Sequence, residues 1–296
     1  MLNSSHTDPG EVTNSKRVWG SMEWFHHLFT TQGCQDPASY FSENGYHIFR
    51  HQQLTDFLAK TTLPSTKHAM LDIGCGTGNS TVLISNRCGF IKTYGMDFVY
   101  DLLKHAQINH PSLYFQVGAL PMIPYRSQTL DLVVICEVLY YLSKNQQERT
   151  LEEINRVLKC GGTLLFSSAL GKKYFHRTDI LSLLSSKFEV VQHGYSYNRL
   201  YHLIIGPLYL LKRLHHLLVT GVEPGTPQSS ELMLRYSWLL NLKLFRFFLE
   251  MICPVTDPIL RLTQIPVLLN KLCQIFCPWL TRTNIMVVAK SKDKLC

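Results

Sequence analysis

A glycine-rich loop follows a short apolar segment early in the chain and limits the folds that the chain can adopt. The segment Ala69–Ile73 predicts a buried strand, and the sequence GCGTG comes directly after it, with glycines at 74, 76 and 78. Glycine has no Cβ, so the backbone can turn sharply there and approach a ligand closely. The spacing G-x-G-x-G differs from the G-x-G-x-x-G of dinucleotide-binding folds. By itself it also fits a simple tight turn.

Strand and helix patterns alternate after this loop. Apolar runs between polar turns predict strands, and apolar residues at helical spacing predict helices. The predicted strands are 69–73, 93–96, 113–117, 130–136, 163–167, 188–193 and 284–289, and the predicted helices are 79–87, 100–109 and 146–158. The alternation predicts an α/β fold, in which a parallel sheet carries helices on both faces.

Two acidic residues flank the glycine loop. Asp72 directly precedes it, and Asp97 closes the second predicted strand, nineteen residues after Gly78. An acid at the end of that strand can accept hydrogen bonds from both hydroxyls of a ribose, and Asp72 can meet an ammonium group. These acids favour a ligand-binding loop over a simple turn.

Together with the segments 131–134 (DLVV) and 156–162 (RVLKCGG), these residues resemble the class I S-adenosylmethionine (AdoMet)-dependent methyltransferases. The resemblance is to the small-molecule branch that includes the ubiquinone/menaquinone methyltransferases, and it covers about residues 40–168. It implies a Rossmann-like sheet of seven strands with the last strand antiparallel. It also implies that AdoMet is the cofactor and lies across the carboxyl ends of the first strands.

The resemblance assigns the cofactor-binding positions residue by residue. They are Asp72, Gly74, Cys75, Gly76, Gly78, Asp97, Phe98, Ala119, Leu120 and Cys136. At Ala119 this chain departs from the family, whose members often carry an Asp that accepts from the adenine N6 amine. The Leu120 amide can still donate to adenine N1, so we expect AdoMet to bind, with an affinity lower by about tenfold at most.

The candidate catalytic residues follow the fourth predicted strand, where the resemblance places the methyl-acceptor pocket. They are Glu137, Tyr140 and Tyr141. Methyl transfer from a sulfonium needs an aligned nucleophile, and a base is optional. Glu137 can take a substrate proton, line the sulfonium or be a solvated carboxylate, and either tyrosine can equally pack a helix. Histidines of the N-terminal region are expected to be surface or packing residues: His26, His27, His47 and His51.

The cysteines predict no metal site. The nine cysteines form no C-x-x-C pair, and Cys273 and Cys277 make a lone C-x3-C without a histidine pattern. We therefore expect reduced thiols, as in a cytoplasmic protein. The first twenty residues are polar and lack the apolar core of a signal peptide. We expect a cytoplasmic location, with attachment at the inner face of a membrane as an alternative.

The patterns divide the chain into five parts. A flexible leader (1–20) and an N-terminal helical cap (21–66) precede the AdoMet-binding Rossmann-like core (67–196). A helical insertion that is apolar and basic (197–282) separates this core from the final strand and tail (283–296).

The insertion is the most unusual segment. From Leu200 onward, eleven Lys/Arg stand against five Asp/Glu, which is six of the eight net positive charges. The stretch 231–251 reads as one helix with a wide apolar face edged by charges, and prolines at 207, 254, 258 and 266 interrupt the apolar runs. No run reaches the roughly 20 apolar residues of a membrane span. Such helices fit a membrane interface, and they also fit a helical subdomain or a dimer interface.

Three functional interpretations follow. The first is methyl transfer to a small hydrophobic or membrane-associated acceptor that is quinone-, polyprenyl- or lipid-like. The second is methyl transfer to a soluble small molecule or a macromolecule. The basic C-terminal third lacks the polar, aromatic-interleaved surface of a nucleic-acid platform, so nucleic acid is not favoured. The third is an AdoMet-fold protein without activity that serves as an interaction module, which Ala119 favours.

Overall fold

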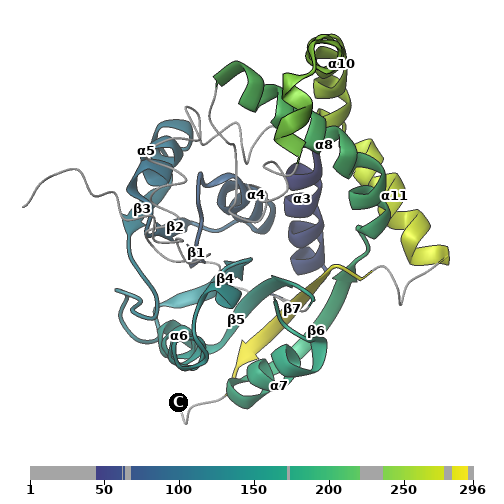
Figure 1. Ribbon diagram of the computed structural model, residues 1–296. Helices are drawn as coiled ribbons and strands as arrows, with labels where there is room; N and C mark the ends of the chain where they lie inside the picture. Colours follow the sequence, from purple (N-terminus) through teal and green to yellow (C-terminus); the bar gives the residue numbers. More distant parts are fainter. Residues whose placement is uncertain are drawn as a thin grey trace, which may run out of the picture.

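The computed structural model describes residues 45–61, 63, 68–171, 174–220, 236–276 and 282–292. A seven-stranded sheet crosses its centre (Figure 1). The strands are β1 (Ala69–Ile73), β2 (Lys92–Asp97), β3 (Tyr114–Val117), β4 (Leu130–Cys136), β5 (Leu158–Ala169), β6 (Phe188–Ser196) and β7 (Asn284–Ser291). Their order is β3-β2-β1-β4-β5-β7-β6, and β7 runs antiparallel to both neighbours. The predicted Rossmann-like sheet with an antiparallel last strand is confirmed.

Helices cover both faces of the sheet. The helices on the sheet are α3 (Gly45–Ala59), α4 (Asn79–Cys88), α5 (Tyr100–Asn109), α6 (Lys144–Val157) and α7 (Arg177–Lys187). The others are α8 (Arg199–Thr220), α10 (Lys243–Arg261) and α11 (Gln264–Phe276), and the 3-10 turns are η1 (Leu139–Tyr141) and η2 (Ser237–Asn241). The first turn of α6 begins two residues before the predicted start, because Ser143 and Gln146 form a capping box there. The sequence reading missed α7, which buries only Ile180 and Leu184.

Two apolar layers hold these helices on the sheet. Side chains such as Leu151 and Ile154 of α6 join Ile180 of α7 in the layer on one face. On the other face, Leu58 of α3 and Ile84 of α4 pack against the strands. The helix α3 therefore belongs to the main core, although the sequence places it in an N-terminal cap. The leader and residues 21–44 of that cap lie outside the described residues.

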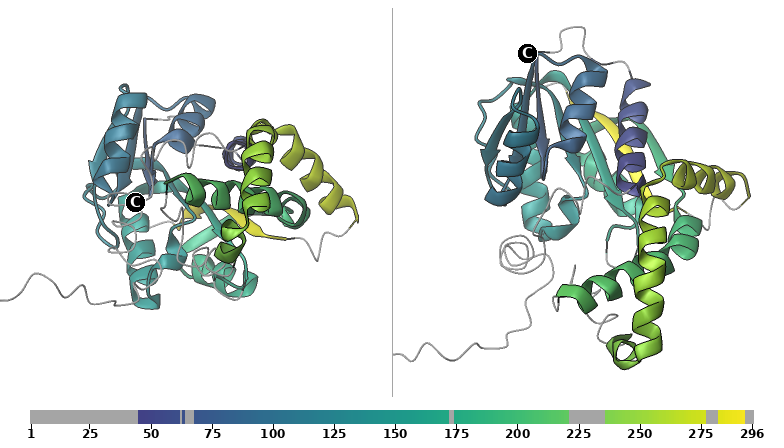
Figure 2. Two further views of the ribbon diagram at one scale, coloured as in Figure 1. Left: turned by 45° about the horizontal axis from the view of Figure 1, so that its top comes forward. Right: turned by 90° about the horizontal axis from the view of Figure 1, so that it is seen from above.

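The insertion forms a helical group beside the carboxyl edge of the sheet (Figure 2). It has small apolar cores of its own. Leu214, Leu249 and Cys253 pack between α8 and α10. Another core gathers around Tyr201 and Leu260, where α8, α10 and α11 meet. The insertion is thus a helical subdomain with internal packing.

Prolines lie inside the helices of the insertion. Pro207 lies inside α8, and Pro254 and Pro258 lie inside α10. A proline removes one helical hydrogen bond, and the packing of α8 on α10 holds both helices despite that loss. The expectation of one helix over 231–251 is wrong, because Leu242 is extended and α10 begins at Lys243. Arg235 lies outside the described residues.

No single described helix is long and apolar enough to cross a membrane, whereas α10 and α11 meet that test only as a pair bent by 66°.

Most of the described cysteines form no disulfide: Cys75, Cys88, Cys136, Cys253 and Cys273. The remaining described cysteine, at 160, is disulfide-bonded, so the expectation of reduced thiols throughout is wrong. The cysteines therefore no longer support a cytoplasmic location, which stays a prediction.

Candidate functional site

The glycine loop joins β1 to α4 at the carboxyl edge of the sheet. Gly74, Gly76 and Gly78 have φ angles of 72°, 54° and 79°, a region that glycine adopts freely. The amides of Gly74 and Cys75 both donate to the Met96 carbonyl, at 2.7 and 3.2 Å, which folds the loop onto the end of β2. A Cβ on Gly76 would meet nothing within 4 Å. The loop backbone therefore faces open space that a ligand can enter.

Asp97 holds the loop from the neighbouring strand. Its Oδ2 accepts from the Gly76 amide and its Oδ1 from the Val99 amide, both at 2.9 Å. Burial raises the pKa of this carboxyl. Each oxygen keeps lone-pair capacity for a hydroxyl, so the predicted ribose contact remains available. The structure adds a second role, because the same carboxylate fixes the loop.

Asp72 is a second buried acid at the same place. Its Oδ2 accepts from the hydroxyls of Thr81 (2.6 Å) and Ser80 (3.1 Å), at the start of α4. Burial raises the pKa of Asp72 to about 6, and the charge of Asp97 adds to the effect. Among the described residues, no lysine or arginine forms an ion pair with either acid. Two buried carboxylates that repel each other favour a cationic ligand.

The residues predicted for an adenine ring follow β3. The Gly118 amide donates to the Asp97 carbonyl at 3.0 Å, which brings this segment to the Asp97 end of the loop. Ala119 is exposed, and Leu120 packs partly against the main core. Phe98 is half-buried beside Asp97. The structure therefore gathers the predicted cofactor positions at one side of the site.

Glu137 stands at the carboxyl end of β4 with a φ of 60°. Its Oε1 accepts from Ser167 Oγ (2.9 Å), Arg50 Nη2 (3.0 Å) and Asn284 Nδ2 (3.1 Å), and its Oε2 accepts from the Ala169 amide (2.8 Å). It is therefore not a solvated strand-end carboxylate. Three donors therefore converge on Oε1 and one on Oε2, which fixes the orientation of the carboxylate. This arrangement favours a positioning role over that of a base.

Arg50 is a functional candidate that the sequence reading missed. It is 6% exposed on α3, and its guanidinium donates to Glu137 and to the hydroxyls of Ser167 and Ser196. These contacts tie α3 to the ends of β4, β5 and β6. The sequence offers one signal for this contact, which is the position of Arg50 around the helix. Arg50 precedes Leu54 by one helical turn and therefore lies on the buried face of α3.

Aromatic and imidazole rings pack where α3 meets α8, next to Arg50. Tyr46 stacks on Tyr201 with ring centroids 4.9 Å apart, and it lies edge-on to His202 at 5.0 Å. The Asn198 amide donates to the Tyr46 hydroxyl at 3.3 Å, while the buried Asn198 Oδ1 has no hydrogen-bond partner in the described part of the chain. These contacts join α3 to the start of α8.

His47 and His51 lie on the same helix as Arg50. Burial lowers the pKa of His47 to about 4 and that of His51 to about 3, and the guanidinium of Arg50 adds to both shifts. At neutral pH both imidazoles are therefore uncharged. Both side chains are half-buried on α3, so packing describes them better than surface exposure. The two earlier histidines lie outside the described residues.

The two predicted tyrosines meet near Glu137. The ring of Tyr140 lies 4.5 Å from that of Tyr141 and 4.9 Å from that of Tyr174. Burial raises the pKa of Tyr140, and the Glu137 carboxylate raises it further. Burial likewise raises the pKa of the Cys136 thiol, with added effects from Asp72 and Glu137. Cys136 thus connects the cofactor acids to this side, which we call the acceptor side: Tyr46, Arg50, Glu137, Tyr140, Asn198, Tyr201 and His202.

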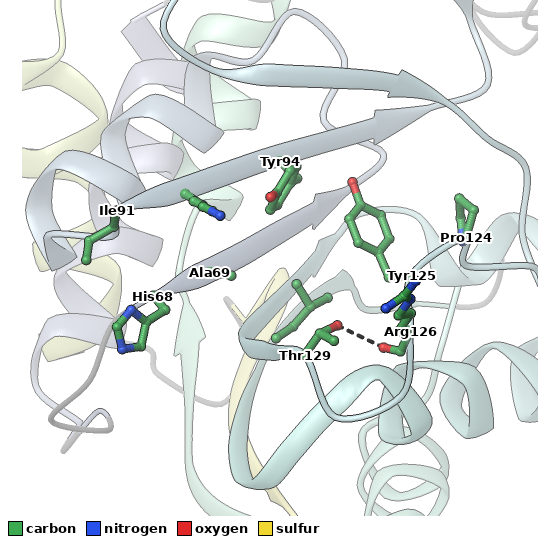
Figure 3. A pocket seen from close by; sticks show the side chains of 10 residues that line it. His68, Ala69, Ile91, Tyr94, Pro124, Tyr125, Arg126 and Thr129 are labelled. Atoms are coloured by element: carbon green, nitrogen blue, oxygen red, sulfur yellow. Dashed lines mark hydrogen bonds between the residues drawn. The ribbon is translucent and has the colours of Figure 1, made fainter.

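A separate cavity of about 460 Å³ lies at the opposite edge of the sheet (Figure 3). His68, Ala69 and Lys92 line it at the amino ends of β1 and β2, together with Tyr125 and Arg126. In a parallel sheet of this kind, ligands bind at the carboxyl ends of the strands, so this cavity is not part of the site above. Within the described ranges, no group of three His, Cys, Asp or Glu is arranged to hold a metal ion.

Comparison with known proteins identifies the family. A model described as a methyltransferase domain matches residues 71–166, from β1 into β5. A predicted methyltransferase of Encephalitozoon cuniculi is 34% identical over 159 residues, which cover 48% of this chain and 72% of that protein. The chain belongs to the class I AdoMet-dependent methyltransferases. Its similarity to the ubiquinone/menaquinone branch stays a prediction.

Other methyltransferases share only part of their length with this one. Malonyl-[acyl-carrier protein] O-methyltransferase 1 of Coxiella burnetii is 34% identical over 99 residues, which cover 33% of each chain. Trans-aconitate 2-methyltransferase of Variovorax paradoxus is 28% identical over 129 residues, which cover 44% of this chain and 48% of the relative. The chain thus spans half or less of the length of these two relatives.

Solved structures support the methyltransferase fold. The [4+2]-cyclase SpnF has a TM-score of 0.53 at 17% identity, with 82% of this chain and 81% of that chain covered. A sarcosine dimethylglycine methyltransferase candidate from Galdieria sulphuraria has a TM-score of 0.53 at 14% identity, with 84% and 86% covered. At such low sequence identity, these similarities show that the fold is shared and do not assign a function.

The cofactor of the family, AdoMet, fits the residues present. Open space lies over Gly76, and the buried acids Asp72 and Asp97 favour its positive charges. When bound, AdoMet supplies the methyl group on its sulfonium. The chain supplies the loop backbone and the two carboxylates that hold it.

Proposed function

We propose that this methyltransferase transfers the methyl group of AdoMet to a small hydrophobic acceptor drawn from a membrane, such as a quinone-, polyprenyl- or lipid-like molecule. The observation that carries the proposal is the place of the insertion. Its first helix, α8, contributes Tyr201 and His202 to the acceptor side, while the same helical subdomain exposes large apolar side chains. The acceptor side is thus joined directly to an apolar surface.

The chemistry of the acceptor side supports a neutral acceptor. Aromatic rings and uncharged imidazoles surround Arg50 from α3 and α8, and the charge of Arg50 is paired with Glu137. Surroundings of this kind bind apolar molecules better than charged ones, because a charge would lose its hydration there. Since four hydrogen bonds hold Glu137 in place, the acceptor would bring its own nucleophile and the protein would align it.

A soluble small acceptor is the second candidate. The relative from Variovorax paradoxus is a trans-aconitate 2-methyltransferase, which points to a soluble acid as the acceptor of that relative. The helical subdomain of the present chain would then serve only as a lid.

The test measures AdoMet binding first, and then which molecules receive the methyl group from labelled AdoMet. Calorimetric titration with AdoMet should show binding, and Asp97→Ala should weaken it by about 1.5–3 kcal/mol, because a charged acceptor is lost. Lipid extracts and aqueous metabolite extracts are then incubated with the protein and methyl-labelled AdoMet.

Label in the lipid fraction supports the proposal, and label only in the aqueous fraction favours the soluble acceptor. Absence of AdoMet binding would overturn both and leave an interaction module. Unchanged binding by Asp97→Ala would mean that the ribose acid lies elsewhere.

A further inference from the structure

The helix α10 has an inner face that packs on α8. Leu249, Cys253 and Leu260 recur along this face and are at most 5% exposed. Leu249 and Cys253 contact Leu214 of α8. This face accounts for the attachment of α10 to the rest of the subdomain.

A second apolar face of α10 is exposed. Leu244, Phe247, Phe248, Met251 and Val255 recur at helical spacing and fall within an arc of roughly 100°. Their exposed fractions range from 41% for Phe248 to 81% for Leu244. At about 1.5 Å per residue, this apolar stripe is roughly 17 Å long. Soluble proteins rarely expose a continuous stripe of this kind without a partner.

Charged residues run along one border of the apolar stripe. By helical phase, three basic residues (Lys243, Arg246 and Arg261) and two acids (Glu250 and Asp257) fall on this border, which leaves it net positive. Directly before the helix, Trp238 is 59% exposed. An apolar face that carries aromatic rings and is bordered by Lys and Arg is typical of a helix lying in a membrane interface.

We propose that α10 lies in the surface of an anionic membrane, with the apolar stripe among the lipid chains and the basic border at the headgroups. The membrane would be the source of the acceptor, so the biological purpose of this contact rests on the proposed function. Binding of α10 to lipid can be measured without methyl transfer. Since α10 packs on α8, docking would turn the acceptor side toward the lipid. The basic border favours anionic lipid over a second copy of this chain, which carries the same positive charge.

The test is sedimentation of the full chain with vesicles of phosphatidylcholine containing about 30% phosphatidylserine. Phe247→Ser with Met251→Ser should lower the affinity at least about tenfold, because each buried apolar side chain contributes about that factor. The matched control is Ile91→Ser with Ile108→Ser, which removes two side chains exposed by 73% and 74% on the sheet domain. This control should pellet like the parent.

Two further measurements complete the test. Lys243→Gln with Arg246→Gln should weaken binding at low salt and have little effect at high salt. AdoMet affinity should be the same in all variants, so loss of AdoMet binding would be a failure of the proposed function and not of the membrane face. A parent that stays in the supernatant, or equal losses in the stripe variant and its control, would overturn the proposal. A dimer that the stripe variant abolishes would assign the face to a second copy instead.

Discussion

Asp72 and Asp97 lie on neighbouring parallel strands, and both carboxyls are buried with raised pKa values. The sequence predicted both, because the glycine loop fixes the end of β1 and the next apolar run fixes the end of β2. Arg50 could not be found in that way. Its partners lie 87 to 146 residues away in the chain, and no local spacing encodes such contacts.

Binding of AdoMet should depend on pH through Asp72. Burial raises the pKa of Asp72 to about 6, above its value of about 3.9 in an unfolded chain. The neutral carboxyl therefore favours folding at low pH, and this contribution is lost as pH rises from about 4 through about 6. A cationic ligand prefers the ionised form of Asp72. The affinity for AdoMet should therefore rise as the pH rises through about 6.

Titrations at pH 7.5 and pH 5 should differ by about tenfold in AdoMet affinity, with the weaker binding at pH 5. Asp72→Asn keeps an acceptor for Thr81 and should bind more weakly at both pH values with a flatter profile. A parent whose affinity does not change between these pH values would place the ammonium group away from Asp72.

The ion pair of Arg50 and Glu137 should show strong coupling. Arg50→Met leaves Glu137 without its cation and should lower the free energy of unfolding by roughly 2 kcal/mol or more. The loss should stay below the roughly 3–5 kcal/mol of a fully buried pair, because Glu137 is 34% exposed. Glu137→Gln alone should also destabilise, and the double variant should lose less than the sum of the two. Chemical denaturation of the four proteins measures this, and additive losses would mean that the pair does not act as a unit.

At the scale of elements, α3 connects the sheet to the helical subdomain. Its first residue, Gly45, lies against the end of α10, where a Cβ would stand 2.7 Å from the Leu262 carbonyl oxygen and 2.8 Å from that of Arg261. Both neighbours are backbone atoms and cannot rotate away. Only glycine permits this approach, so the sequence of α3 is constrained by a helix more than 190 residues later.

Gly45→Ala should therefore lower the free energy of unfolding by about 1–3 kcal/mol, because it overpacks the contact between α3 and α10. The matched control is Gly206→Ala in α8, where a Cβ would meet nothing within 4 Å. This control should stabilise the protein by about 0.5–1 kcal/mol, since alanine favours a helix over glycine. Thermal unfolding measures both changes. A neutral Gly45→Ala would show that α3 and α10 can separate freely.

Element boundaries show where local patterns suffice. The strands β1 and β4 begin and end at the predicted residues, because both are mostly apolar and buried on both faces. The strand β5 was predicted too short, since its glycines at 161 and 162 read as a turn but lie within the strand. Pro207, Pro254 and Pro258 stay inside helices because packing between helices overrides local propensity.

At the scale of the whole molecule, the cofactor-binding residues could be predicted from the sequence, whereas the residues of the acceptor side could not all be predicted. The glycine loop, Asp72 and Asp97 are neighbours in sequence or in adjacent strands. The acceptor side combines α3, three strand ends and α8 (Figure 2). Its assembly depends on how the insertion packs against α3. The sequence patterns of these two segments do not indicate which of their residues will be in contact.

The two ends of the insertion meet in the sheet. β6 ends at Ser196 and β7 begins at Asn284, and the Thr283 amide donates to the Ser196 carbonyl at 2.9 Å. Because these strands are antiparallel neighbours, the whole helical subdomain is in topological terms the enlarged loop of a β-hairpin. A loop whose ends are fixed can gain, lose or exchange helices in the course of evolution without shifting the register of any strand. Acceptor choice in such a lineage can therefore diverge quickly while the cofactor half stays unchanged.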